Sequence, residues 1–155
     1  MTLVSTTLLD RVRDAVSSVC DPEFPSVTID QLGVLEQVRV VGSDVEVDLI
    51  PTFLGCPALE VIETDVRNAV LAVGGVSSIA VRFVTEPAWT PDRISAQGRR
   101  NLGELTVSVR DRTGDTACPV CGSRQVVERS PFGPTACRAI AFCDDCRNPV
   151  EVIRS

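Results

Sequence analysis

Two amphipathic segments, three strand-like segments and a pair of CxxC motifs predict an α+β protein. The expected fold is a small mixed β-sheet with two helices on one face, followed by a C-terminal metal-binding ribbon. Residues 1–90 are rich in Val, Leu and Ile in periodic arrays, whereas the 155-residue chain becomes polar and Arg-rich from Pro91 onward. We therefore expect a domain at 1–90, a linker at 91–117 and a ribbon at 118–155.

The first helix is expected over about 6–19, where apolar residues recur at helical spacing on one stripe and charged residues occupy the other. A loop at 21–25 ends it, because its two prolines have no amide hydrogen to donate. Strands are predicted at 34–41 and 45–50, and the Gly-Ser pair between them suits a hairpin turn.

A second helix is expected over 58–73, because apolar residues again follow helical spacing and Gly74-Gly75 stops the pattern. A third strand follows at 78–84, where apolar and polar residues alternate. A strand, a helix and a strand in succession imply a right-handed crossover and a parallel pair of strands. The predicted sheet is therefore mixed, with both helices on one face.

Four cysteines near the C-terminus form two CxxC pairs separated by 21 residues, Cys118 with Cys121 and Cys143 with Cys146. Such pairs can place four thiolates around one tetrahedral ion, and Gly122 permits the left-handed turn that these motifs need. The chain has no histidine, so the ligand set is all sulfur, which suits zinc best and mononuclear iron second. The alternative is two structural disulfides, which require an oxidising compartment.

Charge and hydropathy limit which cellular compartment and which partners are expected for this protein. Residues 1–5 lack the basic start of a secretion leader, and no stretch approaches the roughly 18 apolar residues of a membrane span. We expect a cytoplasmic protein without a membrane partner, in which seven cysteines serve metals or chemistry. The net charge is −6, and five Arg with four acidic residues give the ribbon a formal +1, so the rest carries −7. This balance argues against nucleic acid as the partner.

Cys56 is the most chemically suggestive residue of the expected sheet domain. Pro57 suits the first position of a helix, which would make Cys56 its N-cap. A thiol there faces free backbone amides and the positive end of the helix dipole, both of which favour thiolate. Cys56 is then a nucleophile, a ligand for a soft metal or cluster, or a small capping residue without chemistry. A single cysteine cannot hold a full cluster, so a cluster there would be shared and labile.

Thr52 and Asp21 are expected close to Cys56. Thr52 stands at the end of the second strand and Cys56 at the start of the second helix, so Thr52 and Cys56 lie at one rim of the sheet. The loop that carries Asp21 could fold over them. Asp21 and Glu23 form a carboxylate pair capable of acid–base work. We favour a different interpretation, in which they order the loop or contact a partner.

Three further residues require separate interpretations. Cys137 lies in an alternating run between the CxxC pairs, which leaves open a place as an additional, fifth sulfur near the metal. Cys20 ends the apolar stripe of the first helix and is expected to be a small buried hydrophobic residue. Trp89 is either a plug over the core or an exposed anchor for a partner, and the plug is favoured.

The motifs that carry a family resemblance run through nearly the whole chain. They are Asp21-Pro22-Glu23-Phe24-Pro25, Leu32-Gly33-Val34-Leu35, Pro51-Thr52, Gly55-Cys56-Pro57-Ala58, Glu86-Pro87-Ala88-Trp89-Thr90, Gly98-Arg99-Arg100 and Phe132-Gly133-Pro134-Thr135-Ala136-Cys137. On these residues the first 90 positions resemble the DUF59 family of iron–sulfur assembly factors. With the ribbon included, the chain resembles the PaaD family, the D subunits of bacterial phenylacetyl-CoA epoxidase systems.

The resemblance implies a maturation role in phenylacetate degradation. A protein of this kind would help assemble the multicomponent epoxidase, aiding iron–sulfur cluster or iron-centre assembly without turning over substrate. The implied partners are the epoxidase reductase or catalytic subunit and iron–sulfur assembly proteins, with a homodimer left open. The implied cofactors are structural Zn²⁺ and a transient iron–sulfur cluster.

The residue types agree with a non-catalytic role. The chain has no histidine, no tyrosine and no phosphate-binding loop. Two alternatives remain. One is a thiol-dependent enzyme that uses Cys56, for which the sequence offers no evident base, and the other is a structural subunit of the oxygenase.

Overall fold

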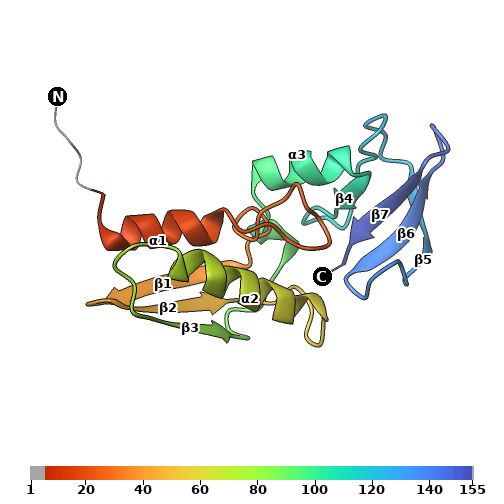
Figure 1. Ribbon diagram of the computed structural model, residues 1–155. Coiled ribbons are helices and arrows are strands. Elements are labelled where there is room, and N and C mark those ends of the chain that lie inside the picture. The colour runs from red at the N-terminus through yellow and green to blue at the C-terminus, as the bar shows by residue number, and fades with distance from the viewer. Residues whose placement is uncertain (1–5, 155) are drawn as a thin grey trace, which may run out of the picture.

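A three-stranded sheet with two helices on one face forms the first half of the protein, as predicted (Figure 1). The structure is a computed structural model that describes residues 6–154, so the segment 1–5 and the outer ends of the two expected domains lie outside the described residues. The elements in order are α1 (Leu8–Ser17), β1 (Leu35–Val41), β2 (Asp44–Leu49), α2 (Ala58–Leu71) and β3 (Ser78–Phe83).

The topology of this sheet follows from its connections. β1 and β2 form the predicted hairpin and pair antiparallel, whereas β2 and β3 pair in parallel across the α2 crossover. At the start of α1, Thr7 and Asp10 form a capping box in which each side chain accepts a hydrogen bond from the other's backbone amide, at 3.1 and 3.0 Å. Val12 and Val16 of α1 are fully buried against the sheet.

Cys20 is exposed, so the prediction of a buried position was wrong. The reason is that α1 ends at Ser17, two residues earlier than expected, and the apolar stripe does not continue to Cys20. The backbone of Cys20 instead forms an isolated bridge with Thr28, which fastens the loop after α1.

The expected linker at 91–117 is ordered and contains a 3₁₀ turn (Pro91–Arg93), α3 (Ala96–Glu104) and β4 (Val107–Val109). α3 begins with Ser95 as N-cap, whose Oγ accepts a hydrogen bond from the amide of Gly98 at 3.0 Å. A Cβ on Gly98 of α3 would lie 2.7 Å from the carbonyl oxygen of Gln31, so the helix rests directly on the loop before β1. This part of the chain is therefore ordered and packs against the first domain.

The ribbon contributes β5 (Val126–Ser130), β6 (Arg138–Cys143) and β7 (Pro149–Ile153). Together with β4 they form a second sheet in the order β4-β7-β6-β5, in which β4 runs parallel to β7 and the other pairs are antiparallel. Figure 1 places this sheet beside the first one, with α3 between them at the top. The pairing of β4 joins the end of the expected linker to the ribbon.

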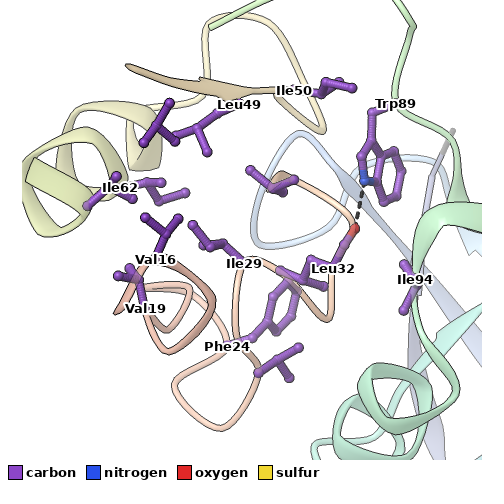
Figure 2. Packing of buried hydrophobic residues seen from close by; sticks show 14 of the residues in the cluster. Val16, Val19, Phe24, Ile29, Leu32, Leu49, Ile50, Ile62, Trp89 and Ile94 are labelled. Carbon is purple, nitrogen blue, oxygen red and sulfur yellow. Dashed lines mark hydrogen bonds between the residues drawn. The ribbon is translucent and has the colours of Figure 1, made fainter. Parts of the chain in front are cut away.

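One hydrophobic core extends across these parts. It includes Ile94, Leu102, Val107 and Ile153 together with the buried residues of the first sheet. Trp89 is 8 % exposed and its indole Nε1 donates to the backbone oxygen of Leu32 at 2.8 Å (Figure 2). Its interpretation as a plug over the core is confirmed.

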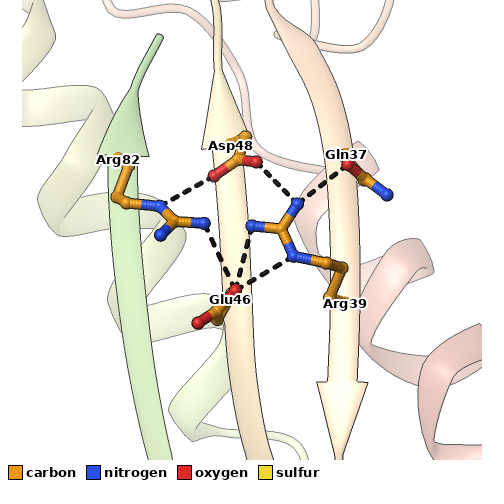
Figure 3. A network of polar contacts seen from close by, with 5 residues as sticks. All are labelled: Gln37, Arg39, Glu46, Asp48 and Arg82. Atoms are coloured by element: carbon orange, nitrogen blue, oxygen red, sulfur yellow. Dashed lines mark hydrogen bonds and ion pairs between the residues drawn. The ribbon is translucent and has the colours of Figure 1, made fainter.

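The face of the first sheet opposite the helices carries a network of ion pairs. Arg39 and Arg82 lie on either side of Glu46 and Asp48, with N···O distances between 2.7 and 3.2 Å (Figure 3). The hydrogen bond from Arg39 outweighs the effect of burial and lowers the pKa of Asp48. The two arginines and the two carboxylates therefore balance one another's charge.

No helix within residues 6–154 is long and apolar enough to cross a membrane.

Candidate functional site

The four cysteines of the CxxC pairs come together in the ribbon. Their sulfur atoms all lie within 4.8 Å of one another, with Cys118 Sγ 3.6 Å from Cys146 Sγ and Cys121 Sγ 3.6 Å from Cys143 Sγ. Sulfurs bound at about 2.3 Å to a tetrahedral ion are about 3.8 Å apart, whereas a disulfide bond is about 2.0 Å long. The donor set fits a four-coordinate metal ion and excludes the disulfide alternative in this arrangement.

The backbone explains why the four sulfurs converge. Each CxxC pair turns back at the residue after its second cysteine, which has a positive φ: 77° at Gly122 and 62° at Arg147. The amides of these two residues donate to the carbonyl oxygens of Cys118 and Cys143, at 2.8 and 2.9 Å. The predicted turn at Gly122 is confirmed, and Arg147 adopts the same conformation although it carries a Cβ.

Asn148 supports the metal-ligating form of Cys146. Its side-chain amide donates to Cys146 Sγ at 3.3 Å. This bond, with the backbone amide of Asn148, lowers the pKa of Cys146 to about 6. A thiolate is the form that binds metal, so the hydrogen bond from Asn148 favours the ligand form of Cys146.

Two further thiols line a narrow pocket between the first domain and the ribbon. Cys56 and Thr52 from the β2–α2 loop line it with Asp21 from the loop after α1, as predicted. Cys137, from the turn before β6, lines the same pocket. Its volume of about 20 Å³ leaves room for about one water molecule. The structure therefore joins residues from three segments that are distant in sequence.

Cys56 lies at the start of α2, one residue further from it than expected. The N-cap is Pro57, whose backbone already has helical angles, and the carbonyl oxygen of Cys56 accepts from the amide of Leu59 at 3.2 Å. The side chain of Cys56 is half-buried. The N-cap position is thus taken by Pro57, and Cys56 lines the pocket instead.

Asp21 orders the loop that closes the pocket. Its Oδ1 accepts hydrogen bonds from the amides of Glu23 and Phe24, at 2.7 and 3.1 Å, and the residue is only 8 % exposed. Burial raises the pKa of Asp21, although these two hydrogen bonds lower it. The favoured interpretation of Asp21 as a loop-ordering group therefore has a geometric basis.

The loop role of Asp21 predicts a difference between two substitutions. Asp21→Ala should lower the free energy of unfolding by about 1–3 kcal/mol, because it leaves two backbone amides without their acceptor. Asp21→Asn keeps Oδ1 and should cost clearly less. Urea unfolding of both variants measures the difference. An equal loss in both would assign the effect to the charge and contradict the loop role.

Cys137 lies away from the four ribbon sulfurs. It stands just before the first residue of β6, while Cys143 is the last, so about 20 Å of strand separates them. The thiol of Cys137 instead contacts Thr135 Oγ1 at 3.1 Å and Glu23 Oε2 at 3.8 Å. Cys137 is therefore too far along the strand to be a fifth sulfur of the ribbon site.

Glu23, which lines the pocket, and Arg138, which lies beside it, were not among the predicted site residues. Arg138 lies 4.7 Å above the ring of Phe24 and pairs with Glu151 and, at 3.9 Å, with Glu23. Burial raises the pKa of Cys137, and the Glu23 carboxylate adds to this effect. The two family motifs that contain Glu23 and Cys137 were the sequence features that could have indicated these contacts.

The two halves match two different family models. The model of an iron–sulfur cluster assembly protein matches residues 9–81, and that of the PaaD zinc beta ribbon domain matches residues 104–154. The ribbon model thus begins before β4, upstream of the expected start at 118.

Related proteins and structures agree with this division. A protein from Escherichia coli K12, provisionally named as the D component of a 1,2-phenylacetyl-CoA epoxidase, is 32 % identical over 90 % of this chain and 88 % of its own length. An Fe-S protein maturation auxiliary factor from Porphyromonas gingivalis W83 is 38 % identical over 57 % of this chain and 84 % of its own. The crystal structure of a DUF59 domain from Bacillus anthracis matches with a TM-score of 0.58 and 28 % identity, covering 62 % of this chain and 92 % of that one.

Fold and sites together define an iron–sulfur assembly domain of the DUF59 type joined to a four-cysteine ribbon. The chain belongs to the PaaD family, which is named for a component of the phenylacetyl-CoA epoxidase system.

Proposed function

We propose that this protein is a non-catalytic maturation factor for the multicomponent phenylacetyl-CoA epoxidase, and that it handles iron or an iron–sulfur cluster at Cys56. The observation that carries the proposal is the pocket in which Cys56, Thr52 and Asp21 meet at the rim of the assembly domain. Relatives of this domain are named as Fe-S protein maturation factors, and the relative that spans both halves is named for the epoxidase.

The chemistry of the pocket suits a transient cargo. A thiolate is a soft ligand that favours iron–sulfur clusters and soft metal ions. Common clusters take four protein ligands, so a cluster held by few thiols of one chain is shared with a partner or a small thiol and is exchangeable. Exchange is what an assembly role needs. We place the protein in the cytoplasm, where its free thiols remain reduced.

A protein partner has access to the pocket. A more open hollow shares Thr52 and Cys137 with it and is lined by Phe53 and Phe132, which are 45 % and 76 % exposed. Exposed aromatic side chains beside a functional group favour protein contact over solvent. The partners we propose are the epoxidase reductase or its catalytic subunit, together with iron–sulfur assembly proteins.

The ribbon in this proposal holds one structural zinc ion. Zinc would be bound by Cys118, Cys121, Cys143 and Cys146, and the bound ion would link the two CxxC turns to each other. Four sulfur ligands leave no open position for water or substrate. The ribbon residues fix the backbone of β6 and β7, and the turn that leads into β6 places Cys137 at the pocket.

The test is a Cys56→Ala variant in cells whose epoxidase depends on this protein. We expect it to keep its ribbon metal and its fold but to lower epoxidase activity at least tenfold, because the cargo loses its ligand. Cys20→Ala, at an exposed thiol outside the pocket, serves as the matched control and should behave like the wild type. Iron content of the purified epoxidase components measures the same step directly.

Full epoxidase activity with Cys56→Ala would remove the thiol mechanism. A role as a structural subunit of the oxygenase would then take its place, and co-purification with the catalytic subunit would identify it. Turnover of a substrate by the isolated protein would instead support a thiol-dependent enzyme.

A further inference from the structure

The pocket contains two thiols that come from different domains, and the proposed function accounts for only one of them. Cys56 belongs to the assembly domain, and Cys137, 7 % exposed, belongs to the ribbon. Neither is among the four ribbon sulfurs that converge on one point. Their shared pocket lies where the loop after α1, the β2–α2 loop and the turn before β6 meet.

The charges around the two thiols favour a cation. Two carboxylates, Asp21 and Glu23, line the pocket with Cys56 and Cys137, and Glu23 Oε2 lies 3.8 Å from Cys137 Sγ. Arg138 is the cation near them, and it is shared with Glu151. If both thiols ionised, the pocket would hold up to four negative groups against one partly engaged guanidinium. A bound metal cation is the kind of ligand that offsets such a charge.

The backbone holds Cys137 at the pocket. The carbonyl oxygen of Cys137 accepts from the amide of Arg154 at 2.8 Å, next to the end of β7. The side chain of Arg138, the next residue, is only 11 % exposed and stacks 4.7 Å above Phe24 of the assembly domain. The side chain of Cys137 is oriented by Thr135 Oγ1 at 3.1 Å. Cys137 is therefore positioned by contacts within the ribbon and across to the other domain.

We propose that Cys56 and Cys137 form a two-thiol site for a single iron(II) ion. The inference rests on the proposed function, since it specifies the ligands of the cargo. Two thiolates leave other coordination positions of the ion open to a donor or a client. The ribbon then has a role besides structure, because it delivers the second ligand.

Cobalt(II) alone is the first probe, added without oxygen to the purified zinc-loaded full chain. Zinc binds more tightly than cobalt, so the ribbon should keep its zinc while cobalt enters the second site. We expect about one cobalt per chain with a thiolate-to-metal charge-transfer band. Cys56→Ser and Cys137→Ser should each weaken cobalt binding at least tenfold and lower that band. Cys20→Ser, the matched control, should leave both unchanged.

A second measurement needs no substitution. A bifunctional thiol reagent that becomes fluorescent only after both arms react should link Cys56 to Cys137 in the zinc-loaded wild type, and peptide mapping identifies the link. Absence of this link, or wild-type cobalt binding by Cys137→Ser, would overturn the two-thiol site. Iron(II) alone and iron(II) with sulfide then distinguish the proposed ion from a cluster, and bound sulfide would contradict the single ion.

These outcomes separate the site from the proposed function. If Cys56→Ala abolishes epoxidase activity while Cys137→Ser binds cobalt like the wild type, the maturation role stands and the two-thiol site fails. If both thiols bind cobalt but Cys56→Ala supports full epoxidase activity, the site stands and the maturation role fails.

Discussion

Replacing Cys121 by Ser is expected to reduce bound zinc from about one ion per chain to nearly none and to unfold the ribbon. The small core of the ribbon contains five buried residues, and two of them, Cys118 and Cys143, are themselves ligands. Without the ion, this core keeps Ala141, Val150 and Val152 with the partly buried Val126, which is little apolar contact to hold the strands together. Metal analysis measures the first effect, and hydrogen exchange over β5, β6 and β7 measures the second.

The same variant should leave the first sheet largely protected from hydrogen exchange, because α1 and α2 cover it with fully buried Val12, Val16, Val66 and Val70. Cys20→Ser controls for the loss of a thiol and should keep its zinc. Full zinc retention in the Cys121 variant would contradict the ligand assignment. Loss of protection throughout the chain would show that the two halves unfold as one unit.

Acidic pH should release the ribbon metal, because its ligands are thiolates. Metal binding requires thiolates, so binding weakens as the thiols take up protons at falling pH. Asn148 lowers the pKa of Cys146 to about 6, which keeps this one ligand deprotonated near neutral pH. The ribbon should consequently lose zinc as the pH falls into the acid range, and metal analysis after dialysis at a series of pH values follows the release.

Local patterns were sufficient to predict most of the first domain and the metal centre. Helical spacing placed the start of α2 correctly, and alternation placed β2 and β3 to within about a residue of their observed ends. Spacing alone was sufficient for the four ribbon sulfurs, because two CxxC turns carry their own geometry. Boundaries were less accurate: α1 ends before Cys20 because the chain turns there to pair with Thr28.

The remaining features depend on contacts between distant segments. α3 contains two glycines and two arginines and has a weak apolar pattern, and its place is set by packing of Gly98 on Gln31. Cys137 shares a pocket with Cys56 only after the ribbon docks on the loop that contains Glu23. No periodicity within a short window records such a contact, so the sequence offered only the family motifs around Glu23 and Cys137.

Replacing Gly33 by Ala is expected to destabilise the protein by about 2–4 kcal/mol. Gly33 has a φ of 72°, a conformation that costs a residue with a Cβ about 1–2 kcal/mol. A Cβ there would also lie 2.4 Å from Cβ of Arg93 and 2.6 Å from its carbonyl oxygen. The 3₁₀ turn would have to move away, and the hydrogen bond from Arg93 Nε to the Gly33 oxygen, 2.8 Å long, would be strained.

Gly42→Ala is the matched control, since Gly42 has a similar φ of 64° but a Cβ there meets nothing within 4 Å. It should show only the cost of the left-handed backbone, about 1–2 kcal/mol. The difference between the two variants in urea unfolding therefore measures how firmly the segment after Trp89 packs on the assembly domain. Equal losses of unfolding free energy would mean that Arg93 and its neighbours can shift at little cost. The segment 91–117 would then behave as the linker that the composition suggests, despite its order.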